Sequence, residues 1–151
     1  MSKETQAQAA HHGDVLASIQ HFFKKDRFAD RANIELVSVS PGQALAKMTL
    51  HPHHLNGYGT VQGGAIFTLA DYAFAAASNS HGTVAVAINA SIWFVKAGTQ
   101  GTLLAEAKEV SCNPKLATYS ITITDDAGEI VAIFEGMVYR KKDQIGQPAR
   151  Q

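Results

Sequence analysis

One carboxylate, Asp71, lies in the middle of an otherwise apolar segment that follows two consecutive glycines, Gly63 and Gly64. Within residues 65–77 only Thr68 and Asp71 are polar, a pattern typical of a helix that other structure surrounds. A charged group in that setting is costly unless it is paired, and proteins keep such groups mainly where they do chemistry. Asp71 is therefore the first candidate catalytic residue.

The glycine pair is expected to begin this helix and to bind an anionic oxygen. The first backbone amides of a helix have no partner inside the helix and lie at the positive end of its dipole. Glycine also leaves room for a ligand atom. Asp71 follows Gly63 by about 12 Å along a helix that rises roughly 1.5 Å per residue, so the two cannot easily act together within one chain. We therefore predict a dimer in which antiparallel helices combine the glycine amides of one subunit with Asp71 of the other.

Hydrophobic periodicity predicts that a sheet covers this helix. Residues 14–28 have apolar positions at helical spacing, with Asp14 as the expected N-cap. After the apolar helix the chain is strand-like with short turns, which favours antiparallel pairing of consecutive strands. A sheet curled around the helix would cover the apolar faces of both, so we predict an α+β fold with about five to six strands. The expected strands are residues 33–39, 43–50, 83–95, 102–111, 118–124 and 129–139.

The composition indicates a single domain. A chain of 151 residues that is 46% hydrophobic can build one substantial core. We assign residues 13–140 to this domain and expect the polar segments 1–12 and 141–151 to be disordered. Thirteen basic residues balance thirteen acidic ones, which argues against nucleic acid or an anionic membrane as a partner. The single cysteine, Cys112, cannot form an internal disulfide, and no apolar leader is visible, so we expect a cytoplasmic protein.

The loop and the apolar helix together resemble those of a known family. Asn56, Gly63 and Asp71, within NGYGTVQGGAIFTLADYAFAAASN, match the spacing of the hotdog-fold acyl-CoA thioesterases of the phenylacetic-acid-pathway type. That family has the pattern Asn, His-Gly-Gly and Leu-Ala-Asp at this loop and helix. The resemblance continues more weakly through SIWFVKAGTQGTLLAEAKEV and DDAGEIVAIFEG, so it spans roughly residues 33–140.

The resemblance implies hydrolysis of an acyl-CoA thioester to a free acid and CoA. The amide of Gly63, supported by Gly64, would hold the developing oxyanion. Asp71 of the partner subunit would activate water as a general base or attack as a nucleophile, and Asn56 would orient the water or the carbonyl. The family's His is Gln62 here, and we expect Gln62 to replace it as an orienting group because an amide can still donate a hydrogen bond.

The same resemblance sets expectations for substrate and assembly. CoA is part of the substrate, so no separate cofactor is expected. The family often pairs dimers into tetramers, which we expect here. The cluster Arg140-Lys141-Lys142, expected after the last strand, offers further cations for the CoA phosphates. The individual candidates for binding are Lys96 and Lys115 for the phosphates, and Leu55, Tyr58, Val61 and Phe74 for the acyl wall.

Two other functions and one metal site are compatible with parts of the sequence. A non-catalytic acyl-CoA sensor is compatible with Gln62. An enoyl-CoA hydratase of this fold would place a His five residues after Asp71, whereas residue 76 is Ala. The segment His51-Pro52-His53-His54 invites a metal assignment, but no cysteine or acidic residue accompanies it at ligand spacing. We therefore expect no metal and interpret these histidines, like His81, as surface residues.

Overall fold

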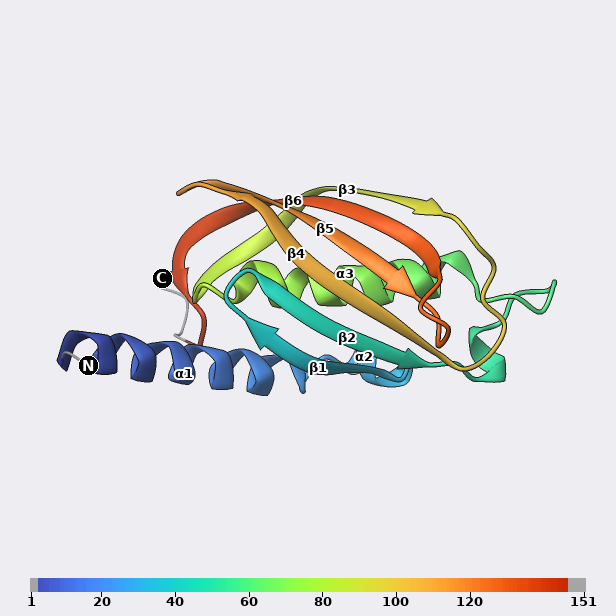
Figure 1. The fold of residues 1–151 in the computed structure, drawn as a ribbon, viewed down its shortest axis with the longest axis horizontal. Helices are drawn as coiled ribbons and strands as arrows, with labels where there is room; N and C mark the ends of the chain where they lie inside the picture. The colour runs from blue at the N-terminus through green and yellow to red at the C-terminus, as the bar shows by residue number, and fades with distance from the viewer. Residues whose placement is uncertain (1–2, 147–151) are drawn as a thin grey trace.

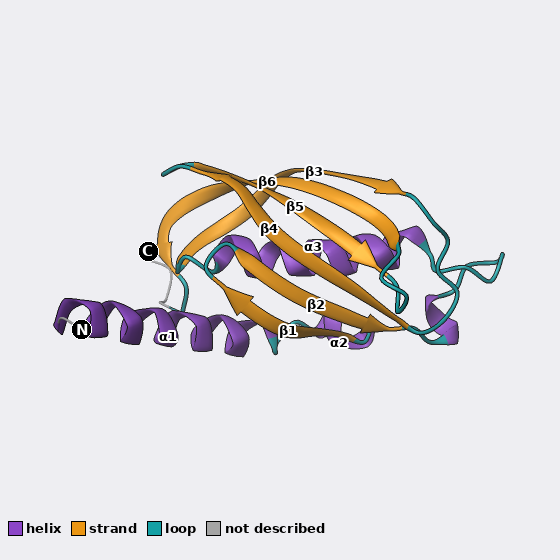
Figure 2. Ribbon diagram, in the orientation of Figure 1, coloured by secondary structure: helices purple, strands orange, loops and turns teal. Residues whose placement is uncertain are grey.

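A six-stranded antiparallel sheet covers one long helix. The structure, a computed structural model, describes residues 3–146. Figures 1 and 2 show the curved sheet lying over α3, with α1 and α2 alongside β1. In chain order the elements are α1 (Lys3–Phe23), α2 (Arg27–Arg31), β1 (Ile34–Ser40), β2 (Gln43–Thr49), a 3-10 turn (Pro52–His54), α3 (Gly63–Asn79), β3 (Thr83–Phe94), β4 (Thr102–Cys112), β5 (Leu116–Thr124) and β6 (Ile130–Gln144). The predicted α+β class and hotdog arrangement are confirmed.

The helix α3 begins at Gly63, as its sequence pattern predicts. Small side chains let the sheet approach it closely, since Ala73, Ala76 and Ala77 are fully buried. Phe74 is 1% exposed and contacts the rings of Tyr119 and Phe134. Phe74 therefore belongs to the core between helix and sheet. Within this protomer its ring packs against the sheet, so its place in the acyl wall stays a prediction.

The strand order differs from the expected pairing of consecutive strands. The order across the sheet is β1-β2-β4-β5-β6-β3, so β3 pairs with β6 and not with β4. The chain between β3 and β4 crosses the open end of the sheet near the start of α3, where Val61 donates a backbone hydrogen bond to Gly98 at 2.8 Å. The crossing leaves β3 at one edge of the sheet, next to the helix start.

The N-terminal region is helical where we expected disorder. The helix α1 already begins at Lys3, so Asp14 lies inside it and is not its N-cap. The helical pattern of residues 14–28 is interrupted after Phe23, and Asp26 caps the short α2 by accepting hydrogen bonds from Phe28 and Ala29 at 3.0 Å each. One side of α1 is anchored through Ile19, which is fully buried. Packing of this side of α1 against the rest of the domain stabilises the helix, although the polar residues at its start did not predict one.

The C-terminal strand is also longer than expected. Residues 141–144, predicted to be disordered, continue β6, so Arg140, Lys141 and Lys142 lie within that strand and not beyond it. The remainder of the predicted tail, residues 147–151, and residues 1–2 lie outside the described residues. Within residues 3–146 no helix is long and apolar enough to cross a membrane.

Candidate active site

The first turn of α3 presents one unoccupied backbone amide. Gln62 is the N-cap, and its side-chain oxygen accepts a hydrogen bond from the amide of Gly64. The carbonyl of Gln62 accepts from Ala65 and Ile66. Among the residues that the structure describes, the amide of Gly63 donates no hydrogen bond. The donor predicted for Gly64 is thus engaged by Gln62, and Gly63 is the group able to hold an oxyanion.

The space beside Gly63 is bounded by Phe94 at the end of β3. A Cβ added at Gly63 would lie 3.1 Å from Cζ of Phe94, closer than ordinary van der Waals contact. Phe94 itself is 55% exposed. Glycine at position 63 therefore keeps open a narrow gap between the helix start and an aromatic ring on the edge strand.

Asn56 organises the loop that leads into α3. Its side-chain oxygen accepts hydrogen bonds from the amides of Tyr58 and Thr60 at 2.9 and 3.2 Å, and its amide nitrogen donates to the Thr60 hydroxyl at 3.0 Å. Leu55 and Val61 close the loop by an antiparallel bridge. A side-chain amide carries two hydrogens. Among the described residues only Thr60 accepts one of them, so the second amide hydrogen of Asn56 is available to a ligand.

His54 anchors the same loop through the hydrogen bonds of its buried ring. The sequence did not predict this role. The ring is 4% exposed and not on the surface as expected. Its Nδ1 accepts from the His51 amide at 2.9 Å, and its Nε2 lies 2.8 Å from the carbonyl oxygen of Ala32, so the neutral ring carries its proton on Nε2. The His54 carbonyl accepts from the Gln62 amide at 2.8 Å. His54 thereby joins the α2–β1 turn to the start of α3.

Asp71 lies halfway along α3 on its least covered side. Burial, together with the nearby charge of Asp26, raises the pKa of the Asp71 carboxyl, so this carboxylate is a better base than an exposed one. Gly64 is exposed and Thr68, Asp71 and Ala75 are half-buried. These four positions repeat at helical spacing and form a stripe that the chain's own sheet does not cover.

Comparison with known proteins decides the family. Residues 58–132 match the thioesterase superfamily model. A relative from Archaeoglobus fulgidus is 40% identical over 126 residues, covering 83% of this chain and 82% of that protein. The acyl-coenzyme A thioesterase PaaI of Escherichia coli is 36% identical over 119 residues, covering 78% and 85% of the two chains. The chain belongs to the thioesterase superfamily. The matched span of this superfamily member includes the helix start, Asp71 and Phe94.

Solved structures agree with that assignment. The structure of the E. coli PaaI protein from the phenylacetic acid degradation operon has a TM-score of 0.82 and 32% identity, covering 86% of this chain and 98% of that one. A Streptococcus mutans protein bound to acetyl-CoA has a TM-score of 0.71 and 29% identity, covering 74% and 91%. The fold of this thioesterase-superfamily chain is thus shared with a protein that binds an acyl-CoA.

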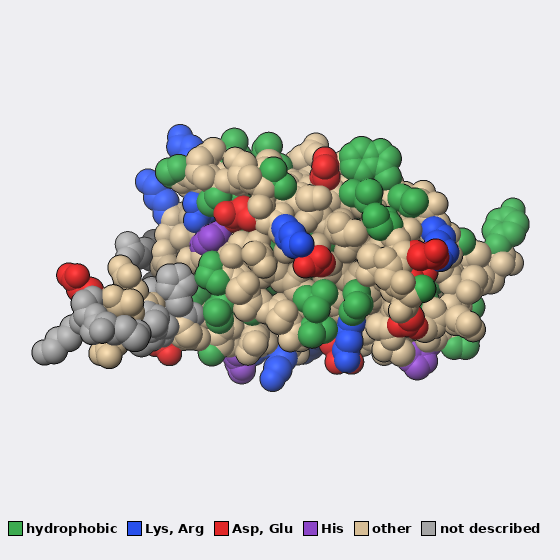
Figure 3. Space-filling view, viewed as in Figure 1, with side chains coloured by type: hydrophobic (Ala, Val, Ile, Leu, Met, Phe, Trp, Pro, Cys, Tyr) green, Lys and Arg blue, Asp and Glu red, His purple; other side chains and the backbone are tan. Residues whose placement is uncertain are grey.

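The residues predicted to bind CoA are distributed over the surface of this superfamily member. Lys96 forms an ion pair with Asp125 at 2.8 Å and another with Glu129, so its charge is already balanced. Lys115 is exposed in the β4–β5 turn, near the C-terminal end of α3. On the face shown in Figure 3, basic and acidic side chains are interspersed. Lys96 follows Phe94, which borders Gly63, by two residues. Lys115 lies near Arg140 and Thr83 at the other end of α3, so the structure does not bring the two lysines together.

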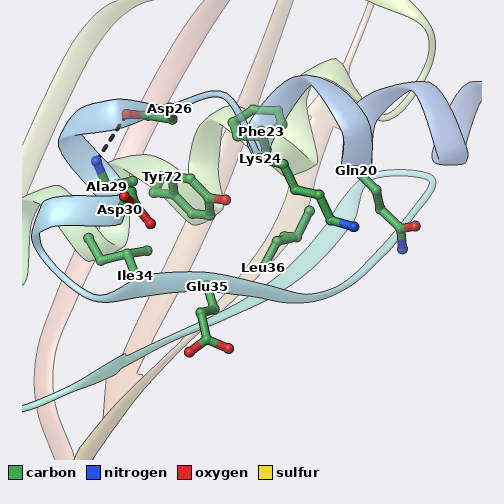
Figure 4. A pocket seen from close by; sticks show the side chains of 10 residues that line it. All are labelled: Gln20, Phe23, Lys24, Asp26, Ala29, Asp30, Ile34, Glu35, Leu36 and Tyr72. Atoms are coloured by element: carbon green, nitrogen blue, oxygen red, sulfur yellow. Dashed lines mark hydrogen bonds between the residues drawn. The ribbon is translucent and has the colours of Figure 1, made fainter.

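The predicted acyl-wall residues do not share a cavity within one protomer. Tyr58 is 95% exposed at the loop tip, whereas Val61 is 6% exposed. A cavity of about 390 Å³ lies elsewhere, between α1, α2, β1 and Tyr72 of α3, as Figure 4 shows. Asp71 does not line that cavity although Tyr72 and Asp26 do. In this thioesterase-superfamily chain the cavity is therefore bordered by the neighbour of Asp71 on α3 and not by Asp71 itself.

Proposed function

We propose that this protein hydrolyses acyl-CoA thioesters, of aryl or medium-chain acids, to the free acid and CoA. The observation that carries the proposal is the free amide of Gly63 on the same helix as the half-buried carboxylate of Asp71. An amide at a helix start stabilises an oxyanion, and a carboxylate with a raised pKa can accept a proton from water. The activity named for the E. coli relative supports the same reaction.

The site requires two protomers. Gly63 and Asp71 are about 12 Å apart along α3, too far for one thioester carbonyl. An antiparallel second α3, with its two-fold axis midway between them near Phe67 and Thr68, would place each Asp71 beside the partner's start of α3. The uncovered stripe of Gly64, Thr68, Asp71 and Ala75 lies on the face that such a pairing needs. A homodimer is therefore part of the proposal, and its pairing into a tetramer follows from the family resemblance.

The edge strand β3 supports the same dimer. Ile88, Trp93 and Phe94 are each more than half exposed, at 55%, 54% and 55%. Figure 3 shows hydrophobic side chains along the upper edge, where Figure 1 places β3. A long apolar edge strand with open backbone groups is a template for pairing with another strand. Antiparallel pairing of two β3 strands would continue the sheet and would bring both Phe94 rings close to the shared sites.

The reaction follows from these positions. Water attacks the thioester carbon, Asp71 takes its proton, and the electron pair moves to the carbonyl oxygen held by Gly63. Collapse of the tetrahedral intermediate then breaks the C–S bond and releases the CoA thiolate. Asp71 could instead attack directly to give a mixed anhydride. In a single turnover in ¹⁸O-labelled water, the general-base route puts the label in the acid. A mixed anhydride that water opens at the Asp71 carbonyl instead puts the label in Asp71 and passes an unlabelled Asp71 oxygen to the acid, so label in Asp71 identifies direct attack.

Substrate binding is assigned by position. The acyl group would lie between the loop residues Leu55, Tyr58 and Val61 and the partner helix, while Phe94 flanks the carbonyl. Asn56 would use its remaining amide hydrogen to orient the carbonyl or the water. The CoA phosphates would recruit exposed lysines, with Lys115 available and Lys96 required to exchange its acidic partners for phosphate.

A sensor without catalysis is the second candidate, because Gln62 already occupies the Gly64 amide. Thiol release from a panel of aryl and aliphatic acyl-CoAs tests both functions. The assays are run in a Cys112→Ser background, since exposed Cys112 would itself react with the thiol reagent. Hydrolysis that falls at least ~100-fold in Asp71→Asn supports the thioesterase. Binding without thiol release from every acyl-CoA supports the sensor and refutes the proposed activity.

A further inference from the structure

Three different metal-binding side chains converge at the end of the molecule opposite Gly63. His81 follows α3, while Glu109 and Cys112 lie at the end of β4. One nitrogen, oxygen or sulfur atom from each residue lies within 4.8 Å of the other two. The cluster is at the C-terminal end of α3, about 15 Å along the helix axis beyond Asp71, so none of its three residues belongs to the proposed catalytic groups.

The carboxylate at the centre of this cluster is held in place. The His81 Nε2 lies 2.6 Å from Oε2 of Glu109, and the Tyr119 hydroxyl donates to the same oxygen at 2.5 Å. Tyr119 is 1% exposed, so its hydroxyl is fixed by the core. The carboxylate is thus oriented by a buried group, as metal ligands commonly are.

We propose that His81, Glu109 and Cys112 bind a zinc ion, with water as the fourth ligand. Imidazole, carboxylate and thiolate together suit Zn²⁺, whereas Mg²⁺ and Ca²⁺ prefer oxygen ligands alone. Tetrahedral Zn²⁺ with bonds of about 2.0–2.3 Å needs donor atoms about 3.3–3.8 Å apart. Zinc binding would require the exposed His81 and Cys112 side chains to rotate to this spacing, with His81 moving away from its present 2.6 Å contact with Glu109. On binding, the Cys112 thiol releases its proton to solvent.

The surrounding charges are mixed and set the strength of the site. Arg140 also faces Glu109 and lowers the pKa of its carboxyl, while its guanidinium donates to the Asn113 carbonyl at 2.8 Å and to the Thr83 hydroxyl at 3.3 Å. The Arg140 guanidinium repels a bound zinc ion. The negative charges of the Glu109 carboxylate and the Cys112 thiolate must compensate for this repulsion, because the His81 imidazole is neutral as a ligand. Bound zinc would tie the α3–β3 turn to the end of β4.

Cobalt substitution tests the site in the tag-free full chain. A thiolate-to-cobalt charge-transfer band reports binding at Cys112 alone, because the chain has a single cysteine. Co²⁺ should give this band at one ion per chain, and Zn²⁺ should abolish it. Cys112→Ser should lose the band, and His81→Ala or Glu109→Gln should weaken binding at least ~10-fold. The matched control, His51→Ala with His53→Ala, removes two exposed imidazoles elsewhere and should retain the band.

Three outcomes would overturn the zinc site. These are absence of the band, a band that survives both His81→Ala and Glu109→Gln, and a stoichiometry of one ion per two chains with metal-induced association in light scattering. The second would indicate binding by an isolated thiolate, and the third a bridge between copies. None of these readouts depends on thioester hydrolysis, so the zinc site and the proposed activity succeed or fail separately.

Discussion

The side-chain oxygen of Gln62 accepts the hydrogen bond of the Gly64 amide. A neutral side chain therefore caps α3 at the position where the family resemblance led us to expect histidine, and it leaves the Gly63 amide as the unoccupied donor. The cap and the oxyanion site are adjacent but use different amides. Substitutions at residue 62 can consequently separate helix stability from catalysis.

Replacing Gln62 with Glu should stabilise the protein and slow hydrolysis. A carboxylate can still accept the Gly64 hydrogen bond, and its charge is favourable at a helix N-terminus by ~0.3–1 kcal/mol. The same charge repels the developing oxyanion, so kcat should fall at least ~10-fold, equivalent to ~1.4 kcal/mol. Gln62→Ala should instead lose ~1 kcal/mol of stability with a smaller loss of kcat. Thermal unfolding and steady-state kinetics measure both effects, and equal kcat values in the two variants would contradict an oxyanion at Gly63.

The acid limb of the activity profile should depend on Asp26. Burial and the charge of Asp26 raise the pKa of Asp71, and the base works only when ionised, so activity should be lost as pH falls through this raised pKa. Asp26→Asn removes the charge but keeps a side-chain oxygen that can cap α2. The acid limb of kcat/KM should then move to lower pH. An unshifted limb would show that Asp71 is not the titrating group.

His54 should make stability fall in mild acid. Burial lowers the pKa of this imidazole below its ordinary value of 6.5, with the neighbouring His53 and His51 adding to the effect. The unfolded chain therefore binds the proton more readily, so stability is full above pH 6.5 and decreases as pH falls toward the folded-state pKa. His54→Ala should cost ~1–3 kcal/mol at neutral pH and flatten this dependence. Denaturant unfolding between neutral and mildly acidic pH checks it, with His21→Ala, at an exposed position of α1, as the control.

Any side chain at Gly136 should clash with the ring of Phe74 and destabilise the protein. A Cβ at Gly136 would lie 2.6 Å from Cζ of Phe74, and this ring is buried and cannot move aside. Gly136→Ala should therefore destabilise the protein by ~1–3 kcal/mol, and Phe74→Leu should recover part of the loss. Gly13→Ala, in α1 with no neighbouring atom within 4 Å, should instead stabilise by up to ~1 kcal/mol. Equal unfolding free energies for the two alanine variants would contradict this packing.

Cross-linking tests the proposed helix pairing. Thr68→Cys in a Cys112→Ser background places the single thiol near the expected two-fold axis. A short bifunctional thiol reagent should then link two chains efficiently. Ser18→Cys on the exposed side of α1 serves as control and should remain uncross-linked at the same concentration. Light scattering that shows a stable monomer at assay concentrations would rule out the shared site.

Local patterns were sufficient for the elements nearest the candidate site. The apolar run with two glycines at its start predicted α3 beginning at Gly63, because helix burial and capping are read from residues within a few positions. The same reasoning placed both ends of five strands, β1 to β5, within two residues and placed Asp71 on α3. It failed at α1 and at residues 141–144, because packing against the body stabilises segments whose own residues are polar.

Local sequence patterns could not predict the contacts between segments that are distant in the chain. Strand β3 pairs with β6 and not with β4, which no local pattern specifies because pairing is chosen among all available edges. His54 is buried because the Ala32 carbonyl meets its ring, and Lys96 is neutralised because Asp125 and Glu129 fold over it. The types and order of the elements, and the carboxylate and amide available for chemistry, were determined along the chain. Which side chains are buried and which edge of the sheet is open were decided only by tertiary contacts.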